Sequence, residues 1–113
     1  METIYKYKIN FLKDQVISAP RGALFLYADI DCNDEPCVWA AVNTDEEEIN
    51  YRVFVVPTGA DFKEIFPDNY EMQRLGMLKR PPYIWHIFIG LERPMQTVEF
   101  DLDDLNSDVE IQL

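Results

Sequence analysis

The chain offers few side chains that could carry out catalysis. Its one histidine, His86, lies in an apolar run, where it shares one face of a predicted strand with Ile84 and Phe88. A general base needs a nucleophile or an orienting acid beside it, and the sequence indicates no such partner. We therefore expect a hydrogen-bonded core histidine in a protein that is not an enzyme.

Metal-binding patterns are also weak. Cys32 and Cys37 are separated by four residues, and there is no second cysteine pair to complete a zinc site. The alternating oxygen side chains of residues 29–33 are similar to the start of a calcium loop, but Asp34 stands where such a loop needs glycine. We expect two thiols and a solvated turn, with no metal and no cofactor.

Charge is the strongest chemical feature of the chain. Ten basic and 21 acidic residues give a net charge of −11 and an isoelectric point near 4.3. Binding to nucleic acid or to an anionic membrane needs clustered Lys and Arg, so we expect neither partner. The acidity serves either solubility alone or the binding of a protein with a basic surface.

Two acidic segments are candidate partner-binding sites. The first is the run Asp45, Glu46, Glu47 and Glu48, which follows a predicted strand. Four consecutive acids cannot lie in a core, so this run should form an exposed loop tip.

The second acidic segment is the C-terminal stretch 91–113. Apolar residues alternate there with acids, namely Val98, Phe100 and Leu102 with Glu99, Asp101 and Asp103. This period of two predicts a strand over 96–103 with one apolar and one acidic face, and a last short strand over 108–112. We expect the extension to pack on the body of the domain and to present Glu99, Asp101, Asp103 and Asp104 to a partner.

The surrounding pattern predicts a mainly β protein. Turn signals recur about every ten residues, which favours a single small antiparallel β-sandwich or barrel-like domain of about seven or eight short strands. Residues 23–30 and 37–42 are apolar throughout and indicate a hairpin in the middle of a sheet, with Trp39 in the core. The spacing of Asp61 and Glu64 predicts a short helix near 61–66 that Pro67 ends. Residues 70–79 suit a helix or a strand, and we favour a strand paired with 83–90.

Size and hydropathy are consistent with one domain spanning residues 1–113. The chain has 113 residues, of which 48% are hydrophobic, enough for a core. No run reaches the ~18 apolar residues of a membrane helix, and the start lacks the layout of a signal peptide. We expect a cytoplasmic protein.

Four fragments together carry a family resemblance. They are the opening Thr3-Ile4-Tyr5-Lys6-Tyr7, the turn Pro20-Arg21-Gly22-Ala23, the strand Pro36-Cys37-Val38-Trp39-Ala40-Ala41-Val42, and Trp85-His86-Ile87-Phe88. In order and spacing, over roughly residues 3–90, they resemble an uncharacterised family of small bacteriophage proteins. The resemblance implies a phage-encoded protein in an infected bacterial cytoplasm, and it implies no activity. Typical members end near the histidine strand, so residues 91–113 would be an addition.

These observations lead to one functional hypothesis and one alternative. The first is a non-enzymatic phage accessory protein that binds and inhibits a host protein, a defence or nucleic-acid enzyme, through an acidic surface. Acids on one face of a strand recur every ~6.6 Å, whereas duplex DNA carries a charge every ~1.7 Å. Imitation of DNA would therefore need 99–110, 45–48 and 29–35 to converge. The alternative is a structural or assembly module that forms complexes, or a homo-oligomer, by pairing edge strands.

Overall fold

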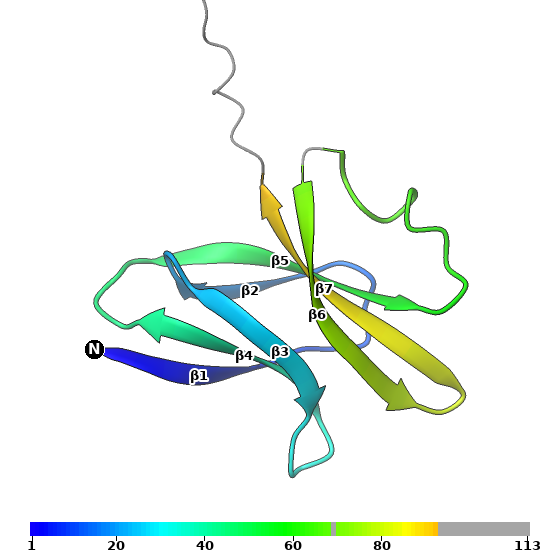
Figure 1. The fold of residues 1–113 in the computed structure, drawn as a ribbon, viewed down its shortest axis with the longest axis horizontal. Coiled ribbons are helices and arrows are strands. Elements are labelled where there is room, and N and C mark those ends of the chain that lie inside the picture. Colours follow the sequence, from blue (N-terminus) through cyan, green and yellow to red (C-terminus); the bar gives the residue numbers. More distant parts are fainter. Residues whose placement is uncertain (69, 93–113) are drawn as a thin grey trace, which may run out of the picture.

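The computed structural model describes residues 1–68 and 70–92, and every regular element in them is a β-strand (Figure 1). The mainly β prediction is therefore confirmed. The seven strands are β1 (Glu2–Lys8), β2 (Gln15–Pro20), β3 (Leu24–Ile30), β4 (Pro36–Asn43), β5 (Glu48–Pro57), β6 (Tyr70–Arg80) and β7 (Tyr83–Glu92).

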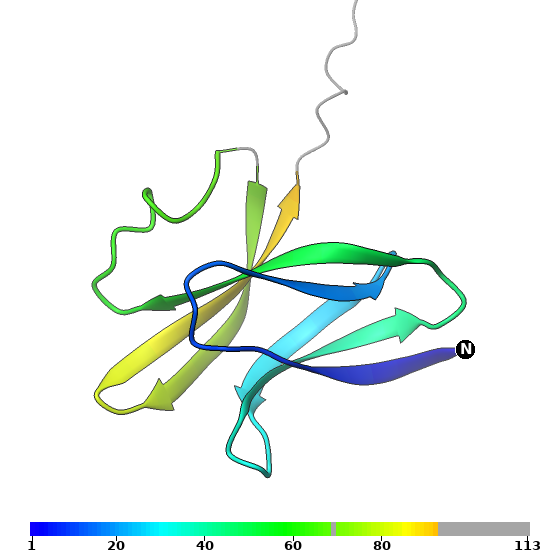
Figure 2. The same ribbon diagram turned by 180° about the vertical axis from the view of Figure 1, so that it is seen from behind.

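The strands form two antiparallel sheets in a sandwich-like arrangement (Figures 1 and 2). One sheet has three strands in the order β1-β4-β3, and the other has four in the order β2-β5-β7-β6. They meet where β3 lies against β6, and there the Gln73 side-chain amide donates a hydrogen bond to the carbonyl oxygen of Phe25 at 3.2 Å. In the described residues no strand of one sheet pairs with a strand of the other, so the sheets do not close into a barrel. Of the two predicted architectures, the structure is sandwich-like.

One core fills the space between the sheets. The three-stranded sheet contributes Val38 and Ala40, which alternate with outward-facing residues of β4. The four-stranded sheet contributes a row of β-branched residues that are fully buried: Val53, Val55, Ile87 and Ile89. β-Branched side chains pack well on such a pleated surface, so these strands hold the sandwich together.

The hairpin of β3 and β4 is confirmed, but its predicted place in the middle of a sheet is wrong for β3. The pairing register shifts between Phe25 and Tyr27, which marks a β-bulge at Leu26. A bulge adds one residue to a strand, so Leu26 and Tyr27 both face outward. In the order β1-β4-β3 this strand is also an edge strand, and its apolar outer residues are exposed.

Trp39 is also not the core residue that the sequence predicts. It lies on the outer face of β4, half-buried, and stacks on Tyr27 with ring centroids 5.2 Å apart. The apolar run 37–42 has two different sides, since Val38 and Ala40 face the core while Trp39 and Ala41 face outward.

The helix predicted near 61–66 is absent; the segment forms turns instead. Asp61 does cap the first turn by accepting a hydrogen bond from the Lys63 N–H at 3.0 Å. The Phe66 N–H donates to the Phe62 carbonyl at 2.9 Å, but Pro67 follows and prevents extension. One turn is too short to be a stable helix. Phe66 packs on the sheet, and Phe62 stacks on Phe66.

The strand favoured over 70–79 is confirmed as β6, which pairs with β7 in a hairpin. This strand contains a register shift between Arg74 and Gly76. Gly76 has a φ of 139°, a backbone conformation that only glycine adopts readily, so the bulge needs glycine there. The strands predicted over 96–103 and 108–112, and the packing of 91–113, lie outside the described residues.

Candidate protein-binding surface

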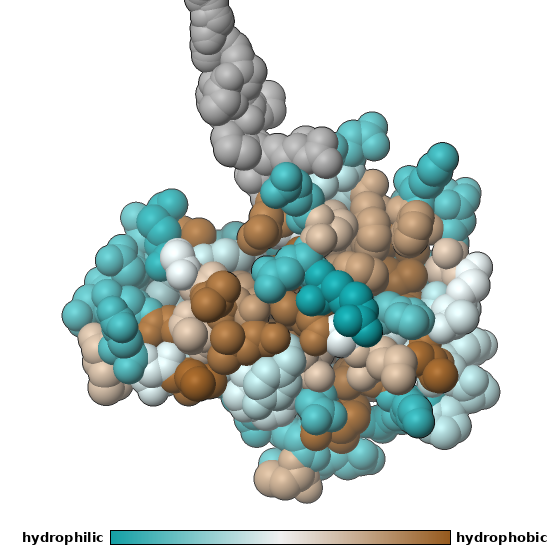
Figure 3. Space-filling view, viewed as in Figure 1, coloured by the Kyte–Doolittle hydropathy of each residue, from teal (hydrophilic) through white to brown (hydrophobic). Residues whose placement is uncertain are grey.

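The outer side of the three-stranded sheet is an apolar surface with no layer of the described chain over it. Figure 3 shows hydrophobic side chains gathered over β3 and β4. The most exposed are Leu24, at 59%, and Ile4, at 58%. We call this surface the open face, formed by Ile4, Leu24, Leu26, Tyr27, Trp39 and Ala41.

One end of the open face is hollowed. A shallow hollow of about 380 Å³ lies between the start of β1 and the end of β4. It is lined by Glu2, Thr3, Ile4, Gly22, Ala41, Val42 and Asn43. Its lining is mixed, with apolar side chains from Ile4, Ala41 and Val42 and polar ones from Glu2, Thr3 and Asn43, and Asn43 leads directly into the next loop.

That loop contains the predicted acidic run, Asp45 to Glu48, which we call the acidic loop. The prediction of an exposed loop tip is confirmed for Asp45, Glu46 and Glu47, while Glu48 begins β5. Glu47 lies 3.3 Å from the Arg21 guanidinium, and the Arg21 N–H donates to the Glu47 carbonyl at 2.8 Å. These contacts hold the acidic loop beside the hollow.

Two further contacts fix the acidic loop, and one acid stays outside them. The Asp45 carboxylate lies 3.2 Å from the α-amino group of Met1, and Glu48 accepts a hydrogen bond from Ser18 at 3.3 Å. Glu46 is exposed and takes part in none of these contacts. The loop therefore presents negative charge from a defined position.

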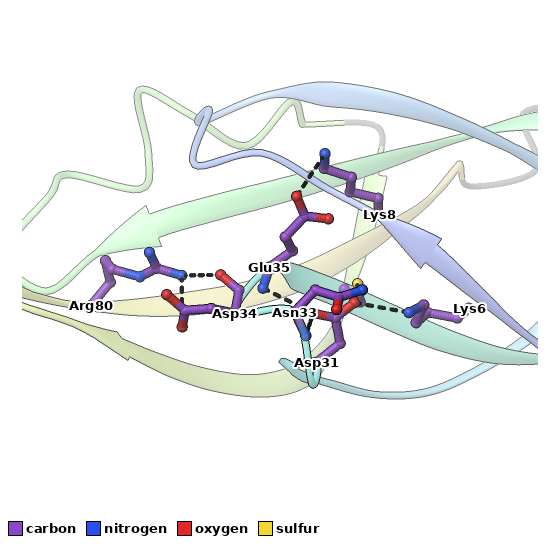
Figure 4. A network of polar contacts seen from close by, with 8 residues as sticks. Lys6, Lys8, Asp31, Asn33, Asp34, Glu35 and Arg80 are labelled. Carbon is purple, nitrogen blue, oxygen red and sulfur yellow. Dashed lines mark hydrogen bonds and ion pairs between the residues drawn. The ribbon is translucent and has the colours of Figure 1, made fainter.

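The acids of the β3–β4 turn have a different role, which Figure 4 shows. The Asp31 side chain is only 5% exposed. Its carboxylate lies 2.8 Å from the Lys6 ammonium and accepts hydrogen bonds from the N–H groups of Asn33 and Glu35 at 2.9 Å. The hydrogen bond from Lys6, together with those N–H groups, lowers the pKa of Asp31 to about 2. The expected solvated turn is therefore wrong for Asp31, which organises the turn.

Its neighbours tie the turn to other strands. Glu35 pairs with Lys8 of β1 at 3.1 Å, and the Arg80 guanidinium donates to the Asp34 carbonyl at 2.9 Å. The nearby cysteines are both free: Cys32 is exposed, Cys37 is buried, and burial raises the pKa of the Cys37 thiol. Among the described residues, no three His, Cys, Asp or Glu side chains are grouped to hold a metal ion.

The acidic loop and the β3–β4 turn do not converge. The β3–β4 turn precedes β4 and the acidic loop follows it, and β4 runs from Pro36 to Asn43. At ~3.3 Å per residue they are about 23 Å apart. The other predicted partner-binding residues, Glu99, Asp101, Asp103 and Asp104, lie outside the described residues.

His86 has the expected polar contact, but it is half-buried rather than a core residue, and the sequence did not identify its partner. The Thr58 hydroxyl lies 2.8 Å from Nε2 of His86, at the edge of an apolar pocket of about 270 Å³ whose lining includes Phe62 and Phe88. A hydroxyl beside an imidazole is one part of a nucleophilic site, but the contact places no orienting acid on the histidine. The contact follows from the pairing of β5 with β7, in which Pro57 lies opposite Trp85 and so brings Thr58 near His86. A local sequence pattern does not give this register.

These features define a class: a small two-sheet β protein with an apolar face bordered by an acidic loop. The chain belongs to the family described as a domain of unknown function, DUF7352, whose model matches residues 1–97. No curated protein and no solved structure matches the chain. Within residues 1–68 and 70–92 there is no helix of the length and hydropathy that crossing a membrane requires.

Proposed function

We propose that this chain is a non-enzymatic phage accessory protein that binds and inhibits a bacterial host protein carrying a basic surface. The partner is a defence or nucleic-acid enzyme of the host cytoplasm. The observation that carries the proposal is the position of the acidic loop beside the open face. The phage origin rests on the sequence resemblance over roughly residues 3–90.

The surface has the composition of a protein interface. Interfaces combine an apolar, aromatic centre with a polar rim, and exposed apolar patches of this kind commonly mark binding sites. Here Leu24, Tyr27 and Trp39 supply the centre and the acidic loop supplies the rim. A partner that fits would place an apolar side chain in the hollow and Lys or Arg residues over the acidic loop.

The arrangement of charge argues for steering rather than for imitation of DNA. The acidic loop and the β3–β4 turn lie at opposite ends of β4, and Asp31 and Glu35 of that turn are already paired with lysines. A single negative patch accelerates the encounter with a basic partner without matching the charge spacing of a duplex.

The proposal is tested with three full-length variants. One neutralises the acidic loop (Asp45→Asn, Glu46→Gln and Glu47→Gln), the second neutralises the C-terminal acids (Glu99→Gln, Asp101→Asn, Asp103→Asn and Asp104→Asn), and the third is Leu24→Ser. Affinity capture from bacterial lysate identifies proteins that wild type retains and Leu24→Ser loses. The association rate of the purified partner is then measured across salt concentrations.

The loop variant should associate about tenfold more slowly at low salt, and the difference should shrink at high salt. Leu24→Ser should chiefly raise the dissociation rate, because it places a hydroxyl in an apolar contact. If neither acidic variant changes the association rate at low salt, the acids serve solubility and the proposed electrostatic role is wrong. If only the C-terminal variant associates more slowly at low salt, the acids that bind the partner lie in residues 91–113.

A further inference from the structure

The outer edge of β1 is the least protected strand edge in the described structure. Natural proteins protect edges with bulges, prolines or covering elements. β3 has its bulge and lies against β6, β6 has its bulge near Gly76, and β2 ends in Pro20. β1 runs seven residues with a continuous register to β4, and it contains neither proline nor glycine.

The hydrogen bonds to β4 determine which backbone groups of β1 are free. The Thr44 N–H donates to the Met1 carbonyl at 2.8 Å, and the Ile9 N–H donates to the Pro36 carbonyl at 3.0 Å. Because antiparallel pairs alternate, the odd-numbered residues of β1 point their N–H and C=O groups at β4. The even-numbered residues therefore point theirs outward, and these are Glu2, Ile4, Lys6 and Lys8.

We propose that β1 pairs antiparallel with β1 of a second copy of this chain, about a two-fold axis through Tyr5. In this register Glu2 lies opposite Lys8 of the second copy, and Ile4 lies opposite Lys6. All four outward residues then form hydrogen-bonded pairs, each exchanging both bonds. Two Tyr5 side chains meet at the axis as a non-hydrogen-bonded pair, where side chains approach most closely.

Other registers are worse for a reason that the sequence supplies. The outward-pointing N–H and C=O groups belong only to even-numbered residues. Any other hydrogen-bonded register therefore slides the second copy of β1 by two residues relative to the first. One shift places Lys6 opposite Lys6, which is repulsive, and leaves Glu2 unpaired. The opposite shift aligns Ile4 with Ile4 and leaves Lys8 unpaired. The register centred on Tyr5 alone uses every outward group and sets opposite charges face to face at both ends.

Lysines on an edge strand ordinarily discourage pairing, but here each has an acidic partner. Within its own chain Lys6 lies 2.8 Å from Asp31 and Lys8 lies 3.1 Å from Glu35, and in the dimer Lys8 would also have Glu2 of the second copy opposite it. Pairing would join the two three-stranded sheets into one six-stranded sheet with both open faces on the same side. This inference is independent of the proposed host partner, because it uses the backbone edge rather than the open face or the acidic loop.

Salt distinguishes the two kinds of association. Each chain carries a net charge of −11, so two copies repel each other and salt should strengthen their association. Binding to a basic partner should weaken under the same change. Sedimentation equilibrium of the full chain, from micromolar to millimolar protein at low and high salt, measures the dimer constant directly.

The backbone is tested with Ile4→Pro, and Ile4→Ala is the matched control. Proline removes an outward N–H that β4 does not use, so the fold should persist, whereas alanine removes only the side chain. We expect Ile4→Pro to weaken the dimer at least about tenfold and Ile4→Ala by no more than about threefold. A wild-type chain that stays monomeric up to millimolar concentration overturns the proposal. Equal losses in both variants also overturn it, because they assign the contact to the open face.

The register is tested by disulfide cross-linking, which does not depend on the proline variant. In a Cys32→Ser background, Tyr5→Cys should form a disulfide-linked dimer on mild oxidation. Directly opposed non-hydrogen-bonded residues have Cα atoms ~4.5 Å apart, within the range of a disulfide. The control Thr3→Cys should not cross-link, since two Thr3 residues would lie about 13 Å apart along the strands. Equal yields from the two variants contradict the register.

Discussion

The two sheets differ in their outer faces, because the described chain covers that of the four-stranded sheet and leaves that of the three-stranded sheet exposed. On the four-stranded sheet, Phe66 contacts Phe54 and Phe88, with ring centroids 5.3 and 5.1 Å away, so the β5–β6 loop covers the sheet. Arg52 lies over the rings of Phe54 and Tyr70 and extends this cover. The three-stranded sheet has comparable aromatic residues, but no described segment covers them. Within the described residues one apolar face is therefore covered and the other exposed, and this contrast is consistent with the binding role proposed for the open face.

The close packing of the covered face also explains Gly90. A Cβ atom at this position would lie 2.9 Å from the Phe54 ring and 3.0 Å from the Tyr70 ring. Side chains of β5 and β6 therefore close over β7 only because Gly90 has no side chain. The open face has no comparable restriction on its strands, so its side chains can change with less effect on the fold.

The largest expected effect is that of Phe54→Ala on the covered face. Phe54 is fully buried under Phe66, so its removal should lower the free energy of unfolding by about 3–5 kcal/mol. Urea denaturation followed by circular dichroism measures the change. A loss of less than about 1 kcal/mol would mean that the loop does not cover this face in solution.

Phe66→Ala should have an intermediate effect. Phe66 is half-buried and belongs to the loop, so the expected loss is about 2 kcal/mol. The variant should also expose Phe54 and Phe88 and so increase the binding of a hydrophobic dye. Unchanged dye binding would show that other residues keep the face covered.

Trp39→Ala should cost least of the three aromatic changes. The indole stacks on Tyr27 at the surface and fills no cavity, which predicts a loss of about 1 kcal/mol. The same urea denaturation measures it. A loss equal to that of Phe54→Ala would show that the open face is buried by something in the intact chain.

The smallest expected effect is a change in pH dependence. The pKa of Asp31 is lowered to about 2 because Lys6 and two backbone N–H groups stabilise its carboxylate. A lowered pKa adds stability above the ordinary value, and this contribution is lost as pH falls from about 4 to about 2. The melting temperature of Asp31→Asn should therefore fall less than that of wild type as the pH is lowered through this window. Identical melting profiles for Asp31→Asn and wild type would contradict the role of Asp31 in holding the turn to β1.

The same contrast explains what could be predicted from the sequence. Period-two alternation and turn residues located all seven described strands, including β6, because those signals are local. The place of β3 at an edge depends on strand pairing, which local pattern does not encode, and the bulge at Leu26 turned a two-sided apolar run into an exposed one. Trp39 fits a core position by sequence because the apolar run 37–42 does not show which side of β4 faces the second sheet.

The candidate site was predicted only in part. Consecutive acids identify the acidic loop, because no core can hold them. Its position beside Ile4 and Gly22 depends on β1 pairing with β4, and the Thr58–His86 contact depends on β5 pairing with β7. The separation of the acidic loop from the β3–β4 turn likewise becomes visible only when β4 is seen to lie between them.

The two tryptophans give the molecule a built-in optical readout. Trp39 lies on the open face, whereas the indole N–H of Trp85 is buried without a hydrogen-bond partner in the described structure, and its ring packs against Phe11 at 5.2 Å. Emission from Trp39 should shift to the blue when a partner covers it, and emission from Trp85 should shift to the red only on unfolding. Docking and denaturation therefore move the fluorescence spectrum in opposite directions, so the unlabelled chain reports which of the two has occurred.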